Sequence, residues 1–227
     1  FLSPQWMQMF THTLNESKRL RLGVDLANGT GWPFGGPWVK DEDASKTIYY
    51  KTFKVSGGEQ LNETVEYKQE GFIRTANNKP ATFDQVLKPV YVNKNLQELA
   101  LDQIQYPGKL PLQILMAYSE DGSMMLDLTE FVDANGNLNW TAPLKNSWML
   151  YALFQGLHGK MVERAAPGGE GYAIDHFSLT AASNYFKKFD ASFKGYDISY
   201  LRSFFNDSYE VDDARGQSNY TPKLFEE

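Results

Sequence analysis

The sequence predicts an α/β protein in which part of a (β/α)8 barrel is interrupted by an inserted β-sandwich-like module. Residues 1–40 and 157–227 alternate between helix patterns, strand patterns and polar loops, as barrel repeats do. Residues 41–156 instead give short strand patterns that are separated by turn signals. Because a closed barrel takes roughly 250 residues, we expect residues 1–40 to be the first part of a barrel and residues 157–227 its truncated continuation.

The composition limits the classes of function. The 227 residues carry a net charge of -6, which argues against a nucleic-acid-binding protein because no basic stripe is available for phosphates. No apolar run approaches the roughly 20 residues that span a bilayer. The absence of cysteine excludes disulfides, thiol catalysis and cysteine-based zinc sites. Aromatic residues make up 15% of the chain, and they fit either a carbohydrate site or, more commonly, a β-rich core.

The first segment predicts a helix, a buried strand and a loop. Residues 3–20, "SPQWMQMFTHTLNESKRL", begin with Ser3 as an N-cap and Pro4 at the first helical position. We expect one apolar face, made of Trp6, Phe10, Leu14 and Leu20. Residues 22–27 then form a short buried strand, and residues 28–39 form a polar, glycine-rich loop.

The middle segment predicts a series of strands. Strand patterns occur at 47–55, 87–92, 110–119, 124–132 and 147–156, and Asn135-Gly136 is a strong hairpin signal. A short helix is expected near residues 96–101. This composition predicts a β-sandwich-like module over residues 41–156.

The last segment returns to the α/β pattern. Ser178 is a candidate N-cap, and the residues that recur at helical spacing after it are Ala182, Phe186, Phe189 and Phe193. Residues 200–206 then form a further strand. If these strands are parallel, the functional residues should lie in the loops that follow them.

Two of these loops offer candidate binding residues. The loop after the first strand carries Asn28, Trp32 and Trp38, and it lacks the Gly-Lys-Ser/Thr ending of a phosphate loop. A later loop carries Asp175 and His176, which point to opposite faces if they lie in a regular strand. A buried histidine with a structural hydrogen bond is the commoner interpretation of His176. The chain shows no ligand spacing for zinc.

The third loop, "FFNDSYEV" at 204–211, joins a strand end to a polar cluster. Asn206, Ser208 and Glu210 share one side of an extended chain, and Asp207 and Tyr209 share the other. Two carboxylates at a strand end suit sugar hydrolysis, in which one acid protonates the leaving oxygen. An ordinary turn is the commoner interpretation of such a cluster. A serine nucleophile is less well supported, because the Gly-x-Ser-x-Gly motif is absent.

Several longer motifs carry a family resemblance. Their order resembles glycoside hydrolase family 106, the α-L-rhamnosidase-like enzymes of bacteria that degrade plant polysaccharides. The resemblance runs from the first helix to Glu227 and is weakest over residues 59–109. The motifs are "LRLGVDLANGTGWPFGGPWV", "LMAYSEDG", "LDLTEFVDANGNLNWTAP", "WMLYALFQG", "RAAPGGEGYAIDHFS" and "RSFFNDSYEV".

The resemblance implies a catalytic (β/α)8 barrel with β-sandwich attachments, inverting hydrolysis of terminal α-L-rhamnose, a periplasmic or secreted location and a calcium ion near the sugar. It implies that Glu210 is a catalytic carboxylate, for which we expect the role of general acid. It also implies that the other candidates shape the sugar site or a metal site. These are Asn28, Trp32, Trp38, Asp175, His176, Asn206 and Asp207.

An inverting enzyme needs a second carboxylate, and no other motif of the chain supplies one. We expect it in the same polypeptide beyond residue 227, so the chain alone should be inactive. Two alternatives stay open. The chain could be a carbohydrate-binding or structural module without catalysis, or part of a barrel glycosidase that acts on another sugar.

Overall fold

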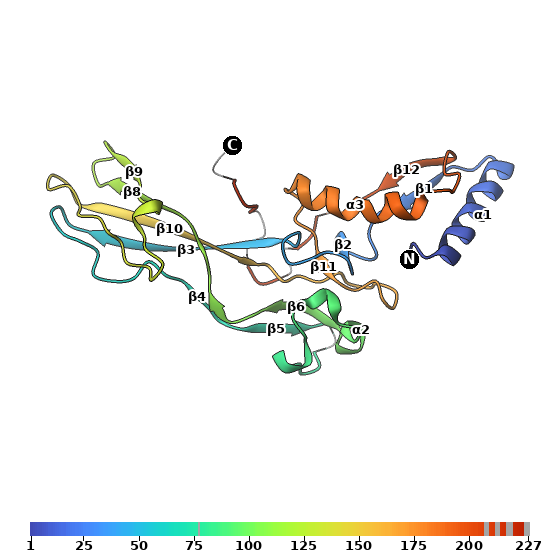
Figure 1. Cartoon of the computed structure of the whole chain (residues 1–227), viewed down its shortest axis with the longest axis horizontal. Coiled ribbons are helices and arrows are strands. Elements are labelled where there is room, and N and C mark those ends of the chain that lie inside the picture. Colours follow the sequence, from blue (N-terminus) through green and yellow to red (C-terminus); the bar gives the residue numbers. More distant parts are fainter. Residues whose placement is uncertain (77, 207–208, 212–213, 217–219, 225–227) are drawn as a thin grey trace. The chain divides into compact units, whose positions relative to one another are not determined.

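The structure, a computed structural model, describes residues 1–76, 78–206, 209–211, 214–216 and 220–224 (Figure 1). It is a mixed α/β structure in which strands outnumber helices, and no closed barrel is present among these residues. The helices are α1 (Pro4–Leu20), α2 (Leu96–Leu99) and α3 (Leu179–Phe193), with 3-10 turns η1 (Phe83–Gln85), η2 (Val90–Val92) and η3 (Thr129–Phe131). The strands are β1 (Val24–Ala27), β2 (Gly35–Gly36), β3 (Lys46–Val55), β4 (Lys68–Gln69), β5 (Phe72–Thr75), β6 (Leu101–Gln105), β7 (Gly108–Lys109), β8 (Leu112–Ser119), β9 (Met125–Asp127), β10 (Trp148–Leu157), β11 (Tyr172–Ala173) and β12 (Leu201–Phe205).

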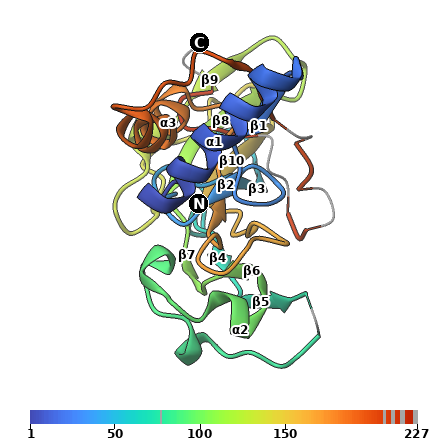
Figure 2. The ribbon, with the colours of Figure 1, turned by 90° about the vertical axis from the view of Figure 1, so that its right-hand side faces the viewer.

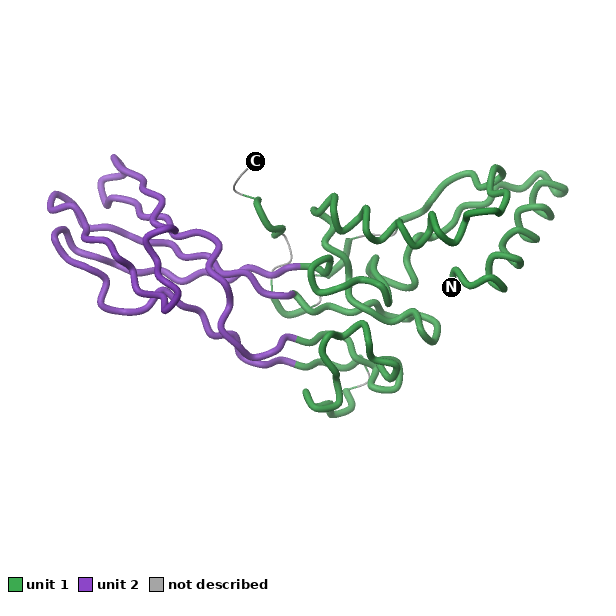
Figure 3. The backbone as a smooth tube through the Cα atoms, viewed as in Figure 1, with its two compact units in different colours: residues 1–45, 73–104, 158–227 green, residues 46–72, 105–157 purple. Residues whose placement is uncertain are grey.

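The chain packs as two compact units (Figure 3). The first contains residues 1–45, 73–104 and 158–227, and the second contains residues 46–72 and 105–157. Residues 73–104 therefore pack with the first unit, although they fall inside the 41–156 module expected from the sequence. Compact packing alone does not define an inserted domain, so the boundaries 1–40, 41–156 and 157–227 stay predictions.

Helix α1 begins as predicted. The Ser3 hydroxyl accepts a hydrogen bond from the Trp6 N–H at 3.2 Å, and the helix buries Met7, Phe10, Leu14 and Ser17. The prediction was wrong for Leu20, which is 52% exposed. At about 100° per residue, the stripe through Phe10 and Leu14 continues to Ser17, whereas Leu20 lies well off it.

Strands β1 and β12 pair in parallel, as the α/β pattern predicted. Asp25 lies opposite Ser203, and Ala27 lies opposite Phe205. Asp25 also receives hydrogen bonds from Arg202 and from the Ser203 hydroxyl across the pair. These bonds lower the pKa of Asp25 to about 2, so its charge is kept throughout the neutral range. The carboxyl ends of the two strands therefore meet at one edge.

Helix α3 precedes β12 (Figure 2) and packs against α1. The rings of Phe10 and Phe193 lie 6.4 Å apart. The predicted cap is confirmed, because the Ser178 hydroxyl accepts from the Ala181 N–H. Of the four residues expected at helical spacing, Phe189 is buried, and Ala182, Phe186 and Phe193 are half-buried. The fully buried positions are Ala181, Tyr185 and Phe189, since the Tyr185 hydroxyl finds partners inside the protein and its ring fills the core.

The second unit is built on an antiparallel sheet with strand order β3-β10-β8-β9. Alternate residues of one face are buried, as in Phe53 of β3, Leu150 of β10 and Ala117 of β8, which lie side by side. Loop residues, including Val65, Leu128, Leu138 and Ala142, complete this core. The predicted strands at 47–55, 110–119 and 147–156 are confirmed, and the region 124–132 splits into β9 and η3.

The strand predicted at 87–92 was wrong, and this region holds the 3-10 turn η2. Pro89 has no N–H to give to a sheet ladder. The Asn93 side chain closes a local loop instead, since its amide donates to the carbonyls of Leu87 and Val90 and its oxygen accepts from the Leu87 N–H. The short helix expected near 96–101 is confirmed as α2.

Candidate functional site

The carboxyl ends of β1 and β12 bring two of the predicted site residues together. Asn28 follows β1 and donates its backbone N–H to the Phe205 carbonyl at 3.1 Å, and Asn206 follows β12 with an exposed side chain. Asp207 and Ser208 lie outside the described residues. This is the edge at which parallel strands of α/β proteins carry binding and catalytic loops.

Asn28 is held rigidly by α3. The Tyr185 hydroxyl lies 2.8 Å from the Asn28 carbonyl and 2.7 Å from the Gly35 carbonyl, so its one proton ties both ends of the loop to the helix. Burial raises the pKa of Tyr185, which keeps the hydroxyl protonated. The Asn28 side chain is 6% exposed, and its Oδ1 has no hydrogen-bond partner in the described part of the chain.

The loop between β1 and β2 packs closely against residues 162–173. Trp32 and Glu163 exchange backbone hydrogen bonds of 3.0 and 2.6 Å. Gly31 is required there, because a Cβ atom at this position would lie 2.3 Å from the Glu163 carbonyl oxygen. The glycines of this loop therefore permit close approach of two backbone segments.

Trp38 lies in an aromatic cluster. Its ring is 5.0 Å from that of Tyr185 and 6.4 Å from that of Phe189. This contact fits the core-filling interpretation of the aromatic residues. The Trp38 indole N–H is buried and has no hydrogen-bond partner among the described residues.

Asp175 and His176 lie beyond the end of β11, outside a regular strand, and their side chains have different partners. The buried Asp175 carboxylate accepts from the Phe177 N–H at 3.0 Å and from the Thr221 hydroxyl at 2.9 Å, so both oxygens have partners. His176 Nδ1 donates to the Ile174 carbonyl at 2.9 Å. Burial lowers the pKa of His176, which favours the neutral ring. Its Nε2 is then a buried acceptor, with no partner in the part of the chain that the structure describes.

Tyr209 joins the third loop to His176. The two rings lie 4.4 Å apart, and the Tyr209 ring also meets that of Phe177 at 5.8 Å. Glu210 follows with an exposed side chain, and Val211 is buried. The loop thus presents one carboxylate between two anchored neighbours. The catalytic role of Glu210 stays a prediction.

The sequence did not predict a buried charge cluster made of Arg74, Asp102, Lys160 and Glu163. Lys160 is completely buried, and its ammonium lies 2.7 Å from Asp102 Oδ1 and also contacts Glu163. Arg74 contacts the second oxygen of Asp102. No strand was predicted at β6 from the sequence, and the Lys160 partner of Asp102 lies 58 residues away.

The cluster keeps its charges. Burial alone would raise the pKa of Asp102, but the hydrogen bond and charge of Lys160 hold it below its ordinary value. Burial alone would lower the pKa of Lys160, but hydrogen bonds to Asp102 and Glu163 raise it. Lys160 is therefore an ammonium fixed between two carboxylates.

The family resemblance implies a calcium ion near the sugar. Among the described residues, no three histidine, aspartate or glutamate side chains are grouped so that they could hold a metal ion. Asp207, which the resemblance offered for such a site, lies outside those residues. The chemistry below is therefore derived without a metal.

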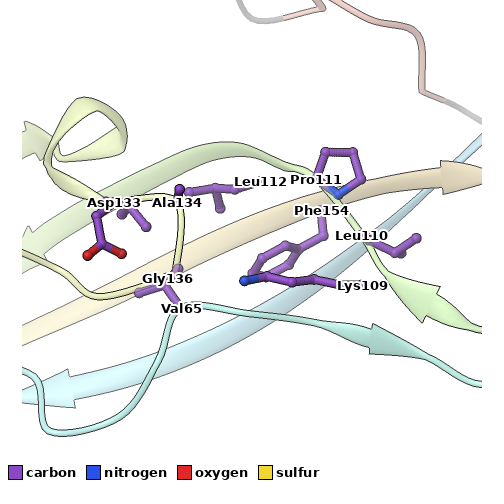
Figure 4. Close-up of a pocket in the computed structure, with 10 residues that line it drawn as sticks. Val65, Lys109, Leu110, Pro111, Leu112, Asp133, Ala134, Gly136 and Phe154 are labelled. Atoms are coloured by element: carbon purple, nitrogen blue, oxygen red, sulfur yellow. The ribbon is translucent and has the colours of Figure 1, made fainter.

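A separate cavity of about 360 Å³ lies in the second unit (Figure 4). Val65, Leu112 and Phe154 give it apolar walls, and Lys109 and Asp133 lie at its rim. The Asp133 carboxylate binds its own turn through Asn135 and Asn137. None of the predicted site residues lines this cavity.

Comparison with known proteins assigns the chain to a family. The model of the alpha-L-rhamnosidase family, glycoside hydrolase family 106, matches residues 1–100 and 114–227. The chain belongs to this family. The resemblance stated from the sequence motifs is therefore confirmed.

Two individual proteins are similar to this family 106 chain. A protein of Formosa agariphila, provisionally named a beta-glucuronidase, is 24% identical over 205 residues, which cover 82% of the chain and 16% of that protein. The rhamnosidase from Novosphingobium sp. PP1Y matches in structure with a TM-score of 0.58 and 16% identity. That match covers 100% of the chain but 35% of the rhamnosidase, and it shows a shared fold. The chain thus spans well under half the length of either protein.

Among the described residues, no helix is long and apolar enough to cross a membrane.

Proposed function

We propose that this chain is part of an inverting glycosidase that hydrolyses terminal α-L-rhamnosyl linkages in plant-type polysaccharides or glycosides. Membership of family 106 supports the reaction class. The observation that carries the proposal is the placement of Glu210, which lies beyond the end of β12 between the anchored residues Tyr209 and Val211. A periplasmic or secreted location, as in polysaccharide degradation by bacteria, belongs to the same proposal.

The proposed architecture is a partial (β/α)8 barrel. The parallel pair of β1 and β12, with α1 before one strand and α3 before the other, supports two barrel repeats. The remaining repeats would be supplied by the rest of the polypeptide. We therefore propose that residues 1–227 are inactive as an isolated chain.

In the proposed mechanism, Glu210 is the general acid. It donates a proton to the glycosidic oxygen as the bond to the anomeric carbon breaks. A second carboxylate then activates a water molecule on the opposite face of the sugar, roughly 6.5–9.5 Å from the first. We place that second carboxylate beyond residue 227.

The sugar would bind in front of the strand ends. Asn28 Oδ1 and His176 Nε2 are buried acceptors without partners in the described structure. The proposal gives each of them a sugar hydroxyl as its partner. Phe34 links them, because its ring contacts both Tyr185, at 4.6 Å, and His176, at 5.5 Å. The proposal includes all the predicted binding residues, namely Asn28, Trp32, Trp38, Asp175, His176, Asn206 and Asp207.

The proposal is tested by Glu210→Gln in the full-length protein. The substrate is phenyl α-L-rhamnoside, whose leaving group needs a proton. We expect kcat to fall by about 10²–10⁴-fold, the typical contribution of a general acid, with rhamnose binding retained in calorimetry. The control is Glu98→Gln, which changes an exposed glutamate of α2. Near-normal turnover in Glu210→Gln would reject Glu210 as the acid.

The similarity to the Formosa agariphila protein raises a second sugar, a β-linked glucuronide. The site favours a neutral sugar. We expect the Asp175 carboxylate, which is buried and adjacent to His176 in the chain, to repel a uronate. Parallel assays with phenyl α-L-rhamnoside and phenyl β-D-glucuronide separate the two, and turnover of the glucuronide alone would replace the rhamnosidase proposal.

A further inference from the structure

Gln103 of β6 is a completely buried polar residue with an unusual set of partners. Its Oε1 accepts the Arg215 N–H at 2.8 Å, and its Nε2 donates to the Arg215 carbonyl at 2.7 Å. The second proton of Nε2 goes to the His158 carbonyl at 2.8 Å. The side chain thus pairs with the backbone of Arg215 as a neighbouring strand would.

The residue that Gln103 holds belongs to the segment that carries Glu210. The Ala214 N–H donates to the Val211 carbonyl at 3.1 Å, and Val211 follows Glu210 directly. Val211 itself is buried. The pairing of Gln103 with the backbone of Arg215 therefore holds the residue next to Ala214, whose N–H binds Val211.

The other side of Glu210 is fixed separately. Tyr209 packs its ring on that of His176 at 4.4 Å. Glu210 thus stands between a ring contact and a hydrogen-bonded turn, and its own side chain is exposed. Loss of either anchor would let the carboxylate move without unfolding the core.

The three bonds of Gln103 also satisfy its buried amide, which would be costly to leave unpaired. Gln103 and Arg215 are 112 residues apart in the chain. The bonds therefore hold Arg215, five residues after Glu210, against β6.

We propose that Gln103 is a positioning residue for the general acid, which it holds in place through Arg215 and the backbone hydrogen bond between Ala214 and Val211. This inference rests on the proposed role of Glu210. Gln103 touches neither the sugar nor the reacting atoms in this scheme, so its effect must appear in the proton-transfer step.

Proton transfer is revealed by the choice of leaving group. A phenyl group leaves as a strong base and needs a proton from the acid, whereas a 2,4-dinitrophenyl group leaves without one. A displaced general acid therefore slows the first substrate and spares the second. A merely structural defect would lower the amount of active enzyme and would slow both substrates equally.

The experiment uses Gln103→Met in the full-length protein. We expect kcat/KM for phenyl α-L-rhamnoside to fall by about 10–100-fold, the scale of a misplacement of about 1 Å, and kcat/KM for the 2,4-dinitrophenyl substrate to change by less than about 3-fold. The matched control is Gln69→Met, which removes a buried amide that donates to the Tyr106 carbonyl in the second unit. Equal losses for both substrates, or no loss, would overturn the proposal.

A second variant, Gln103→Glu, tests the proposal if Gln103→Met does not fold. Gln103→Glu keeps the size and can still accept the Arg215 N–H, but it cannot donate to the carbonyls of Arg215 and His158 while ionised. The same dependence on leaving group is expected, and its absence in a folded Gln103→Glu protein would count against the inference.

Hydrogen–deuterium exchange separates this inference from the proposed function. In Gln103→Met, backbone amides at 209–216 should exchange at least about 10-fold faster, a reading that does not depend on catalysis. If Glu210→Gln keeps its turnover, the proposed role of Glu210 fails. Unchanged exchange at 209–216 would instead refute the anchoring by Gln103, whatever Glu210 does.

Discussion

At the scale of the residue, we expect the buried ammonium of Lys160 to contribute strongly to the stability of the folded protein. Lys160→Met would leave the carboxylates of Asp102 and Glu163 without their ammonium. We expect the free energy of unfolding in urea to fall by about 3–5 kcal/mol, as for other buried pairs that lose one partner. The control, Lys51→Met, breaks an exposed pair with Glu63 and should cost at most about 1 kcal/mol. Equal losses in the two variants would contradict the role given to Lys160.

The same variant has a pH signature. The folded-state pKa of Asp102 is lowered, so the unfolded chain binds a proton that the folded one does not. This contribution to stability is present above the ordinary Asp pKa of about 4 and is lost as the pH falls through the folded value. In Lys160→Met the loss of unfolding free energy between neutral pH and the acid range should be smaller than in the wild type. Urea titrations of both proteins at several pH values measure this change in unfolding free energy.

At the scale of the element, helix α3 depends on its cap. Ser178→Ala removes the hydroxyl that accepts from the Ala181 N–H, and it should lower the free energy of unfolding by about 1 kcal/mol. Ser183→Ala makes the same chemical change on the exposed surface of α3, where alanine has the better helix propensity. We expect no loss, or a slight gain, in that control. A cap variant as stable as wild type in thermal unfolding would remove Ser178 from this role.

The elements show what local sequence can predict. Ser3 and Ser178 marked their helix starts correctly because capping uses atoms only three residues apart. The apolar pattern of α3 did not include Tyr185, although this residue is buried. The Tyr185 hydroxyl has hydrogen-bond partners in loop carbonyls far away in the chain, which the local pattern does not reveal. The strand predicted at 87–92 was wrong because the Asn93 side chain makes local hydrogen bonds there, which the apolar pattern of the neighbouring residues does not reveal.

The candidate site divides in the same way. Asn28, His176 and Glu210 were predicted as site residues because each follows a strand pattern. In the structure Tyr185 binds the Asn28 carbonyl, Phe34 and Tyr209 contact His176, and Tyr209 precedes Glu210. The hydrogen bonds of Gln103 and Lys160 could not be predicted, because their partners Arg215 and Asp102 lie 112 and 58 residues away in the chain. Polar residues in a short strand pattern gave no indication of which distant groups would satisfy them.

At the scale of the whole molecule, the two compact units have separate cores. Leu150→Ala removes a fully buried side chain from the core of the second unit, and Leu14→Ala does the same for α1 in the first. Each should destabilise its own unit by about 2–5 kcal/mol. Hydrogen–deuterium exchange should therefore accelerate in residues 46–72 and 105–157 for Leu150→Ala. It should accelerate around α1 for Leu14→Ala. Acceleration throughout both units in both variants would show that they unfold as one.

The parallel pairing of β1 with β12 also affects how the chain is made. Asp25 and Arg202 are 177 residues apart, so at about 5–20 residues per second the ribosome would need roughly 10–35 s to supply the partner of β1. The strands β3, β8 and β10 can meet during that interval. Throughout it the backbone groups of β1 remain open to other nascent chains, and a chaperone that shields residues 24–27 would raise the yield of folded protein.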